Sequence, residues 1–241
     1  FSSVELAKTA LALLERHGAS LNCVAHLMPD VALAQARKAD RELKAGADRG
    51  PLHGIPYGAK DLLSARGAPT EWGSFAFEGQ RLDADATVIK RLREAGAVLV
   101  AKLAMVSLAG GGGYRYASAS ISGPGRTPWD IGRWSGGSSS GSGAAVGAAL
   151  VPFAIGSETW GSIVVPSTFC GVTGLRPTYG RVPRTGAMAL SWTLDKLGPM
   201  ARSAQDASLV LAAIAGPDGV DPSAVLATYA HPRRIRRGLR V

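Results

Sequence analysis

The chain has 241 residues, of which 46% are hydrophobic and 31 are glycine, a composition that fits a folded α/β protein and excludes a disordered chain. No stretch approaches the roughly 18 uninterrupted apolar residues of a membrane-spanning helix, so we expect no membrane contact. The formal net charge is +9, and a run of arginines near the C-terminus supplies five of these charges. This run lacks interleaved aromatic residues, so we expect a solvated segment and no direct binding of nucleic acid. Its members are Arg233, Arg234, Arg236, Arg237 and Arg240.

The two cysteines, Cys23 and Cys170, are too few for a disulfide framework or a zinc site. We expect both to be buried thiols in a reducing compartment, which indicates the cytoplasm. The sequence contains no HExxH motif, no pair of CxxC motifs and no phosphate-binding P-loop. We therefore expect neither a metal ion nor a cofactor.

The first half of the chain predicts alternating helices and strands. Ser2-x-x-Glu5 has the spacing of a capping box, and Asp85 is placed to cap a later helix. A helix followed directly by a β-branched strand is typical of an α/β layered fold. The expected elements are a helix from Ser2 to near Gly18, a helix over 31–45, a strand ending at Lys60, a helix over 86–95 and a strand over 97–102.

The second half predicts shorter elements separated by glycine-rich loops. The segment 131–136 carries Gly, Arg, Trp and Ser and is a poor candidate for a strand. Ser203-x-x-Asp206 has the spacing of a helix cap. The other expected elements are a loop containing Gly110–Gly113, a helix over 143–150, a strand over 151–155, a helix starting near Ser162 and a final helix stopped at 216–219.

The stretch from Trp134 to Thr178 carries the candidate chemistry. Two clusters of glycine and serine, at 136–143 and 156–162, flank the apolar segment Ala144–Ile155. Glycine lets the backbone approach a ligand closely, and serine hydroxyls act as donors, acceptors or nucleophiles. A flexible linker would lack the apolar flanks. We therefore expect two polar loops held by a buried segment, which is how a reaction site is commonly built.

Two familiar motifs match this stretch only superficially. Residues 137–141 fit the G-x-S-x-G nucleophile elbow, but that motif needs a preceding strand, and only His231 follows late enough to complete its triad. Glycines at 141, 143 and 147 suggest a dinucleotide-binding loop, which also needs a preceding strand and an acidic residue about 20 positions later. The sequence disfavours both.

A third arrangement combines two serines and a lysine. Ser162 follows a glycine at an expected helix start, where backbone N–H groups are free. Ser138 lies in the first glycine–serine cluster, and Lys60 ends a strand. Burial would lower the pKa of Lys60 and make it a base, whereas the alternative is a surface lysine whose amine reaches solvent. Serine–lysine systems need no histidine.

These residues resemble the amidase signature family over essentially the whole chain. The family hallmark reads GGSSGGS, then G(T/S)(D/E)TGGSIR.P and FCG..GL(K/R)PT. This chain has GGSSSGSGAAV at 136–146 and GSETWGSIVVPSTFCGVTGLRPTYGRV at 156–182. GIPYGAKD at 54–61 resembles the family's lysine motif, and the spacing of the two serines, 162 − 138 = 24, is the family spacing.

The resemblance implies an α/β/α fold with a mixed central sheet and hydrolysis of an amide bond without a cofactor. By it Ser162 is the nucleophile, Ser138 is the bridging serine, often preceded by a cis peptide bond, and Lys60 is the base. The backbone N–H groups that would form the oxyanion hole belong to Thr159, Trp160, Gly161 and Ser162. The residues that would contact substrate are Gly136, Gly137 and Ser139.

The chain departs from the family pattern in three respects. Trp160 stands where the family usually has glycine, and Val164-Val165 stand where the A subunits of glutamyl-tRNA amidotransferases typically carry Arg-Gln. Family members are near twice this length, so we expect one domain over 1–241 without the C-terminal half, a sheet incomplete on that side and an open acyl pocket. Leu239 and Val241 are expected to begin a further strand.

Three functions remain open at this stage. The first is an amidase acting on a small-molecule amide, alone or as a homodimer. The second is the glutaminase or transamidation subunit of a tRNA-dependent amidotransferase, which would need partner proteins. The third is a non-catalytic family member that serves as an interaction module.

Overall fold

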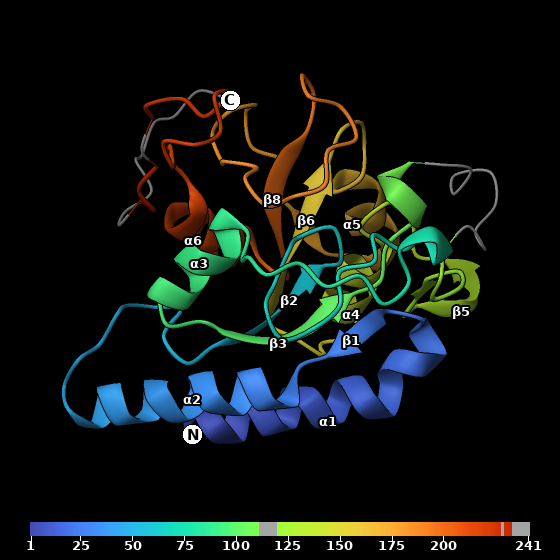
Figure 1. The fold of residues 1–241 in the computed structure, drawn as a ribbon. Coiled ribbons are helices and arrows are strands. Elements are labelled where there is room, and N and C mark those ends of the chain that lie inside the picture. The colour runs from blue at the N-terminus through green and yellow to red at the C-terminus, as the bar shows by residue number, and fades with distance from the viewer. Residues whose placement is uncertain (111–119, 228, 233–241) are drawn as a thin grey trace, which may run out of the picture.

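A six-stranded mixed sheet runs through the centre of the computed structural model, which describes residues 1–110, 120–227 and 229–232 (Figure 1). The strand order is β1-β3-β2-β6-β8-β7, in which β3, β2 and β6 are parallel and every other pairing is antiparallel. The expected mixed sheet is thus confirmed. Its strands are β1 (Val24–Leu27), β2 (Pro56–Lys60), β3 (Val98–Leu103), β6 (Phe153–Glu158), β7 (Thr173–Gly174) and β8 (Lys196–Ala201).

Helices cover both faces of the sheet, which confirms the α/β/α architecture. Three helices pack on one face, where α1 and α2 form the long lower layer in Figure 1, and two pack on the other. A short helix of seven residues, α5, contacts α4 and β7. On the first face lie α1 (Ser3–Leu21), α2 (Pro29–Lys44) and α4 (Ser140–Gly147); on the second lie α3 (Thr87–Glu94) and α6 (Ala204–Ile214); α5 is Val164–Cys170.

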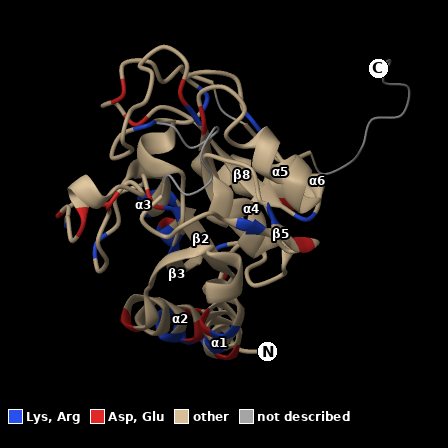
Figure 2. Ribbon diagram, turned by 90° about the vertical axis from the view of Figure 1, so that its right-hand side faces the viewer, with Lys and Arg blue, Asp and Glu red and all other residues tan. Residues whose placement is uncertain are grey.

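The helices next to the sheet bury small side chains, which lets the layers approach closely. In α2 the buried residues are Ala32, Ala36 and Ala39, spaced three and four apart on one side of the helix. The opposite side of α1 and α2 carries charged residues of both signs, whereas α4 shows none (Figure 2). The charged residues of this helical layer therefore lie on α1 and α2. Within the described residues, no helix combines the length and the apolar character needed to cross a membrane.

Two of the three expected helix caps are confirmed. Ser2 Oγ accepts from the Glu5 N–H at 3.1 Å and the Glu5 carboxylate accepts from the Ser2 N–H at 2.8 Å, and Ser203 caps α6. The cap expected at Asp85 is wrong, because α3 begins after Ala86 without a side-chain cap. The Asp85 carboxylate instead accepts from the Arg66 N–H at 2.8 Å and pairs with Arg93.

The segment 131–136 was expected to be a poor strand, and this expectation is wrong. β5 (Asp130–Trp134) pairs with β4 (Arg126–Thr127) in a separate two-stranded ribbon with an exposed outer strand. A two-residue connection, Pro128-Trp129, joins the strands, and proline at this turn position fixes a suitable φ angle. The ribbon stands outside the main sheet, so β5 is not the central strand that a nucleophile elbow requires.

Other differences are shifts of element boundaries. The helix expected over 143–150 begins at Ser140, and the strand expected over 151–155 extends as β6 to Glu158. The extension follows from pairing with β8, whose Lys196 lies opposite Glu158. Two short 3-10 turns complete the described elements, η1 (Phe75–Phe77) and η2 (Ser107–Ala109). Residues 111–113 of the glycine run and the strand expected at 239–241 lie outside the described residues.

Candidate active site

Lys60 is the last residue of β2, and its side chain is completely buried. Because β3 and β6 run parallel to β2 on either side, the carboxyl ends of three strands meet at one edge of the sheet. At this edge Lys60 Nζ lies 2.7 Å from Ser138 Oγ and 2.9 Å from Ser157 Oγ. Burial lowers the pKa of Lys60 well below its usual range, and the charges of Asp195 and Glu158 oppose this only in part. The environment therefore favours the neutral amine, the form that accepts a proton.

Ser138 lies between β5 and α4 and is also completely buried. The peptide bond between Gly137 and Ser138 is cis, as the family resemblance implies. The Ser138 carbonyl oxygen accepts a hydrogen bond of 3.1 Å from the Val106 N–H, which ties this segment to the chain that follows β3. The predicted contact between Lys60 and Ser138 is thus present, across 78 residues of sequence.

Ser162 lies in the turn between β6 and α5 and is almost fully buried. Gly161, just before it, has a φ of 94°, which a glycine adopts without the steric cost that a side chain would bring. The Ser139 N–H donates to the Ser162 carbonyl oxygen at 3.2 Å. This bond joins the two glycine–serine segments, so the segments carrying Ser138 and Ser162 are adjacent.

The loop from β6 to Ser162 is fixed by β8. The Thr159 hydroxyl donates to the Asp195 carboxylate, and Lys196 Nζ donates to the Thr159 carbonyl oxygen at 3.1 Å. Within the described chain, the backbone N–H groups of Trp160 and Gly161 have no hydrogen-bond acceptor. The indole of Trp160 is 87% exposed, so it lies outside the buried site. The loop therefore holds two unused backbone donors next to Ser162.

Glu158 also holds this loop in place. Its buried carboxylate accepts hydrogen bonds from the Ile163 N–H at 2.8 Å and the Val164 N–H at 2.9 Å, the first N–H groups of α5. The Arg176 guanidinium lies 3.5 Å from the other Glu158 oxygen. A carboxylate at a helix start satisfies donors that the helix leaves unpaired. Glu158 thus fixes where the turn carrying Ser162 begins its helix.

The three residues expected to contact substrate occupy different surroundings. Gly136 and Gly137 lie at the cis peptide bond that precedes Ser138, and their contact with substrate stays a prediction. Ser139 is buried, and its hydroxyl accepts from the Ser157 N–H and donates to the Ser157 carbonyl oxygen, both at 3.2 Å. A side chain on Gly156 would come within 2.9 Å of that hydroxyl. In this arrangement Ser139 braces β6.

Sequence reasoning missed two residues near this edge of the sheet. The motif at 156–162 includes Ser157 without giving it a role, although its hydroxyl lies 2.9 Å from the Lys60 amine. Lys102, at the end of β3, is a second completely buried lysine, and its Nζ atom lies 2.8 Å from both Asp61 Oδ1 and Thr70 Oγ1. Asp61 directly follows Lys60 in sequence, which is the signal that could have indicated a buried ion pair.

No group of three or more His, Cys, Asp or Glu residues is placed to hold a metal ion within the described part of the chain. Cys23 and Cys170 are both buried and free, as expected. Burial raises the pKa of each thiol to about 12, so both are unreactive. The side-chain groups within hydrogen-bond distance of the Lys60 amine are the hydroxyls of Ser138 and Ser157.

Comparison with known proteins identifies relatives of this chain. The profile of the amidase family matches residues 5–241. The chain is 46% identical over 225 residues to the A subunit of the glutamyl-tRNA(Gln) amidotransferase of Methylococcus capsulatus, covering 93% of this chain and 46% of that protein. Among solved structures, the native peptide amidase of Stenotrophomonas maltophilia has a TM-score of 0.85 and 44% identity, covering 92% of this chain and 46% of that one.

A second solved structure is the A subunit of the glutamyl-tRNA(Gln) amidotransferase of Thermotoga maritima, with a TM-score of 0.80 and 32% identity, covering 94% of this chain and 46% of that one. The chain thus spans about half the length of the relatives it matches. The family profile extends over nearly all of the sequence, and the α/β/α fold and the glycine–serine segments agree with it. The chain therefore belongs to the amidase signature family.

Proposed function

We propose that this chain carries the catalytic residues of an amidase, with Ser162 as nucleophile, Ser138 as proton relay and Lys60 as base. The observation that supports this most is the buried Lys60 amine, 2.7 Å from Ser138 Oγ, on a segment hydrogen-bonded to the Ser162 backbone. A neutral amine in reach of a serine hydroxyl replaces histidine in serine–lysine hydrolases. The substrate is a small-molecule carboxylic amide.

The first half-reaction forms an acyl-enzyme. Lys60 accepts the proton of Ser138 as Ser138 accepts the proton of Ser162, and Ser162 Oγ attacks the amide carbonyl carbon. The tetrahedral intermediate then expels the amine, which takes a proton back through Ser138 from Lys60. The lowered pKa of Lys60 suits this cycle, because the same group must release the proton it accepted.

The negative charge on the intermediate needs fixed donors. The unused N–H groups of Trp160 and Gly161 lie next to Ser162 in the turn that Asp195, Lys196 and Glu158 hold in place. We assign the oxyanion hole to the backbone of residues 159–162. In comparable sites the loss of one such donor costs about 3–4 kcal/mol of transition-state stabilisation.

The second half-reaction releases the acid. A water molecule takes the place of the departed amine, and the Ser138 and Lys60 pair removes its proton as it attacks the acyl carbon. Collapse of the second intermediate returns the proton to Ser162 Oγ. Both half-reactions use the same groups, so no cofactor is required.

Covalent labelling tests the assignment of the nucleophile. A fluorophosphonate should modify Ser162, and tryptic peptide mapping should find the adduct there in the wild-type chain and nowhere in Ser162→Ala. Ser142→Ala is a matched control, because Ser142 is a buried serine in the same cluster whose hydroxyl binds the Ile155 carbonyl oxygen. An adduct on Ser138 or Ser139 in the wild-type chain would contradict the proposed roles.

A second function is favoured by one specific observation, the 46% identity to the A subunit of an amidotransferase. In that case the chain would release ammonia from glutamine and pass it to a partner. Arg-Gln, which such subunits typically carry after Ser-Ile, is replaced here by Val164-Val165. Measurement of ammonia from glutamine and from simple amides separates the two functions, and we propose the simple amidase.

Three further assignments accompany the proposal. We propose that residues 1–241 fold as one amidase signature domain, because one sheet joins the N-terminal and C-terminal elements. The buried free thiols of Cys23 and Cys170 favour a reducing compartment such as the cytoplasm. The reaction scheme needs neither nucleic acid nor a second protein, and a homodimer would be compatible with it.

A further inference from the structure

An apolar cavity adjoins the candidate active site. Its volume is about 240 Å³, and its walls come from the chain after β2, the loop over 184–192, the start of β8 and the segment 220–222. Two of its lining residues, Ser157 and Thr159, belong to the site described above. Ser157 Oγ lies 2.9 Å from Lys60 Nζ, and Thr159 leads the turn to Ser162. The apolar walls are formed by Leu62, Met188, Leu190, Trp192 and Leu197.

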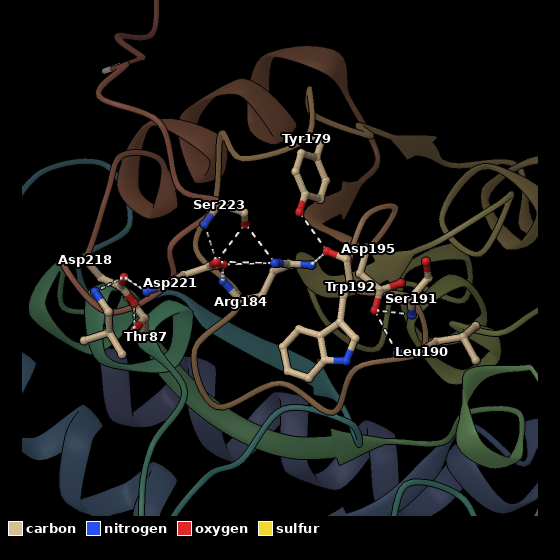
Figure 3. Close-up of polar contacts among 11 residues, drawn as sticks. Thr87, Tyr179, Arg184, Leu190, Ser191, Trp192, Asp195, Asp218, Asp221 and Ser223 are labelled. Carbon is tan, nitrogen blue, oxygen red and sulfur yellow. Dashed lines mark hydrogen bonds and ion pairs between the residues drawn. The ribbon is translucent and has the colours of Figure 1, made fainter.

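Among the described residues that line the cavity, the single guanidinium group is that of Arg184, and it is already engaged (Figure 3). Two of its nitrogens lie 3.1 and 3.3 Å from the two carboxylate oxygens of Asp221. Its other hydrogen-bond acceptors are the Trp192 carbonyl oxygen at 2.7 Å and Ser223 Oγ at 2.8 Å. Each of the three Arg184 side-chain nitrogens therefore already has a protein acceptor, and these four hydrogen bonds use four of its five N–H groups.

The other carboxylate in the wall, Asp195, is likewise occupied. One oxygen accepts from the Thr159 hydroxyl. The other accepts from the Leu190 N–H at 2.7 Å and the Ser191 N–H at 2.9 Å (Figure 3). Since Arg184 and Asp221 neutralise each other, the charge left among the lining residues is negative. A second carboxylate in this cavity would be repelled and would lose its hydration without compensation.

We propose that this cavity receives the acyl group of the substrate, and that the preferred substrate is a primary amide of an uncharged arylaliphatic carboxylic acid. The assignment rests on the proposed amidase function. An apolar cavity of about 150 Å³ takes up a benzene molecule, so the larger volume here has room for one aromatic ring with a short aliphatic link. Thr159 lies in the cavity wall and leads into the turn carrying Ser162, so we expect the amide end of such a group to face that turn.

The same cavity excludes glutamine as a good substrate. The acyl part of glutamine carries an ammonium and a carboxylate group, and each would need a partner on burial. Arg184, Asp195 and Asp221 are already paired with protein groups, so little of their charge is left to compensate an ammonium or a second carboxylate. Rate comparison between amides therefore tests the cavity directly.

The experiment measures kcat/KM of the 241-residue chain with 3-phenylpropionamide, acetamide and L-glutamine. Burial of a phenyl group should favour 3-phenylpropionamide over acetamide by about 10- to 100-fold, with glutamine no better than acetamide. Ala187→Leu narrows the cavity from its wall and should reduce the ratio of 3-phenylpropionamide to acetamide about tenfold. Ala76→Leu, at an exposed position in η1 away from the cavity, is the matched control and should leave the ratio unchanged.

A binding measurement tests the cavity independently of catalysis. Calorimetric titration of 3-phenylpropionamide into Ser162→Ala should show binding, weakened about tenfold when Ala187→Leu is added. The cavity assignment would be overturned if acetamide and glutamine were hydrolysed with the same kcat/KM as 3-phenylpropionamide, or if Ala187→Leu did not change the ratio of kcat/KM between 3-phenylpropionamide and acetamide. Either result would leave the proposed amidase function standing. If 3-phenylpropionamide bound in the cavity but no amide was hydrolysed and Ser162 was not labelled, the cavity assignment would be supported and the proposed amidase function would be overturned.

Discussion

Lys60 and Lys102 are both completely buried at the ends of adjacent parallel strands, yet within the described residues only Lys102 has a carboxylate within hydrogen-bond distance. Lys102 pairs with Asp61 at 2.8 Å, whereas Lys60 contacts the hydroxyls of Ser138 and Ser157. Successive residues of a strand point to opposite faces, and Lys102 lies opposite Ala59 in the register, so the two amines face different surroundings. The difference favours a structural ion pair for Lys102 and the base for Lys60.

Matched substitutions of the two lysines should separate these roles. Lys60→Met should lower kcat by about 10²- to 10⁴-fold, the range for loss of a general base, with the far-ultraviolet circular dichroism unchanged. Lys102→Met leaves the Asp61 carboxylate buried without its partner and should destabilise the chain by about 3–5 kcal/mol in urea unfolding. Full activity in Lys60→Met would remove the proposed mechanism, whatever the result for Lys102.

The pH dependence of stability should also distinguish Lys60. Its pKa is lower in the folded chain than in the unfolded chain, where it is about 10.4. Below that value the unfolded chain binds the proton first, so the lysine lowers stability progressively as pH falls toward its folded pKa. Lys60→Met lacks this penalty. Its unfolding free energy relative to wild type should therefore rise as the pH falls from 10 to 7, and a difference independent of pH would contradict the lowered pKa.

The rate of amide hydrolysis should also depend on the protonation state of Lys60. Protonated Lys60 cannot accept the proton of Ser138, so kcat/KM should fall on the acid side, with a limb well below the ordinary pKa of lysine. A pH–rate profile measures this limb directly. Residual hydrolysis by Lys60→Met should lack this limb, and a limb that persists in the variant would contradict the assignment of Lys60 as the base.

Ser157 should act as a positioning residue for the base. Ser157→Ala removes one of the two hydroxyls next to the Lys60 amine and should reduce kcat about 3- to 15-fold, the equivalent of one hydrogen bond. The acid limb of the pH–rate profile should shift as well, which a purely structural role would not produce. Ser157→Thr retains the hydroxyl and should restore both properties.

The sequence predicts most of the layered architecture because its signals are local. Capping boxes, helix periodicity and a lysine at a strand end depend on a few neighbouring residues, as at Ser2 and Lys60. The residue types suggest the combination of Lys60 with Ser138, and the resemblance to a family supports it. Contacts between distant segments could not be predicted: β6 extends to Glu158 only because β8 pairs with it, and Asp85 binds Arg93 instead of capping α3.

Trp160 is the departure from the family pattern that most affects whether the chain is an active enzyme. A bulky side chain in place of glycine next to Gly161 would disable the site if it filled the oxyanion hole, which would favour a non-catalytic family member. The indole is 87% exposed, however, and the Trp160 backbone N–H remains without an acceptor within the described residues. The hole needs only the backbone donor.

Trp160→Gly should therefore change kcat for acetamide by less than about threefold, because a surface side chain away from buried contacts contributes little. The melting temperature should change only slightly for the same reason, apart from the added freedom of glycine in the unfolded chain. Trp192→Gly is a useful comparison, since Trp192 is also exposed but lines the apolar cavity. A wild-type chain without activity that gains turnover only in Trp160→Gly would show that the tryptophan closes the site.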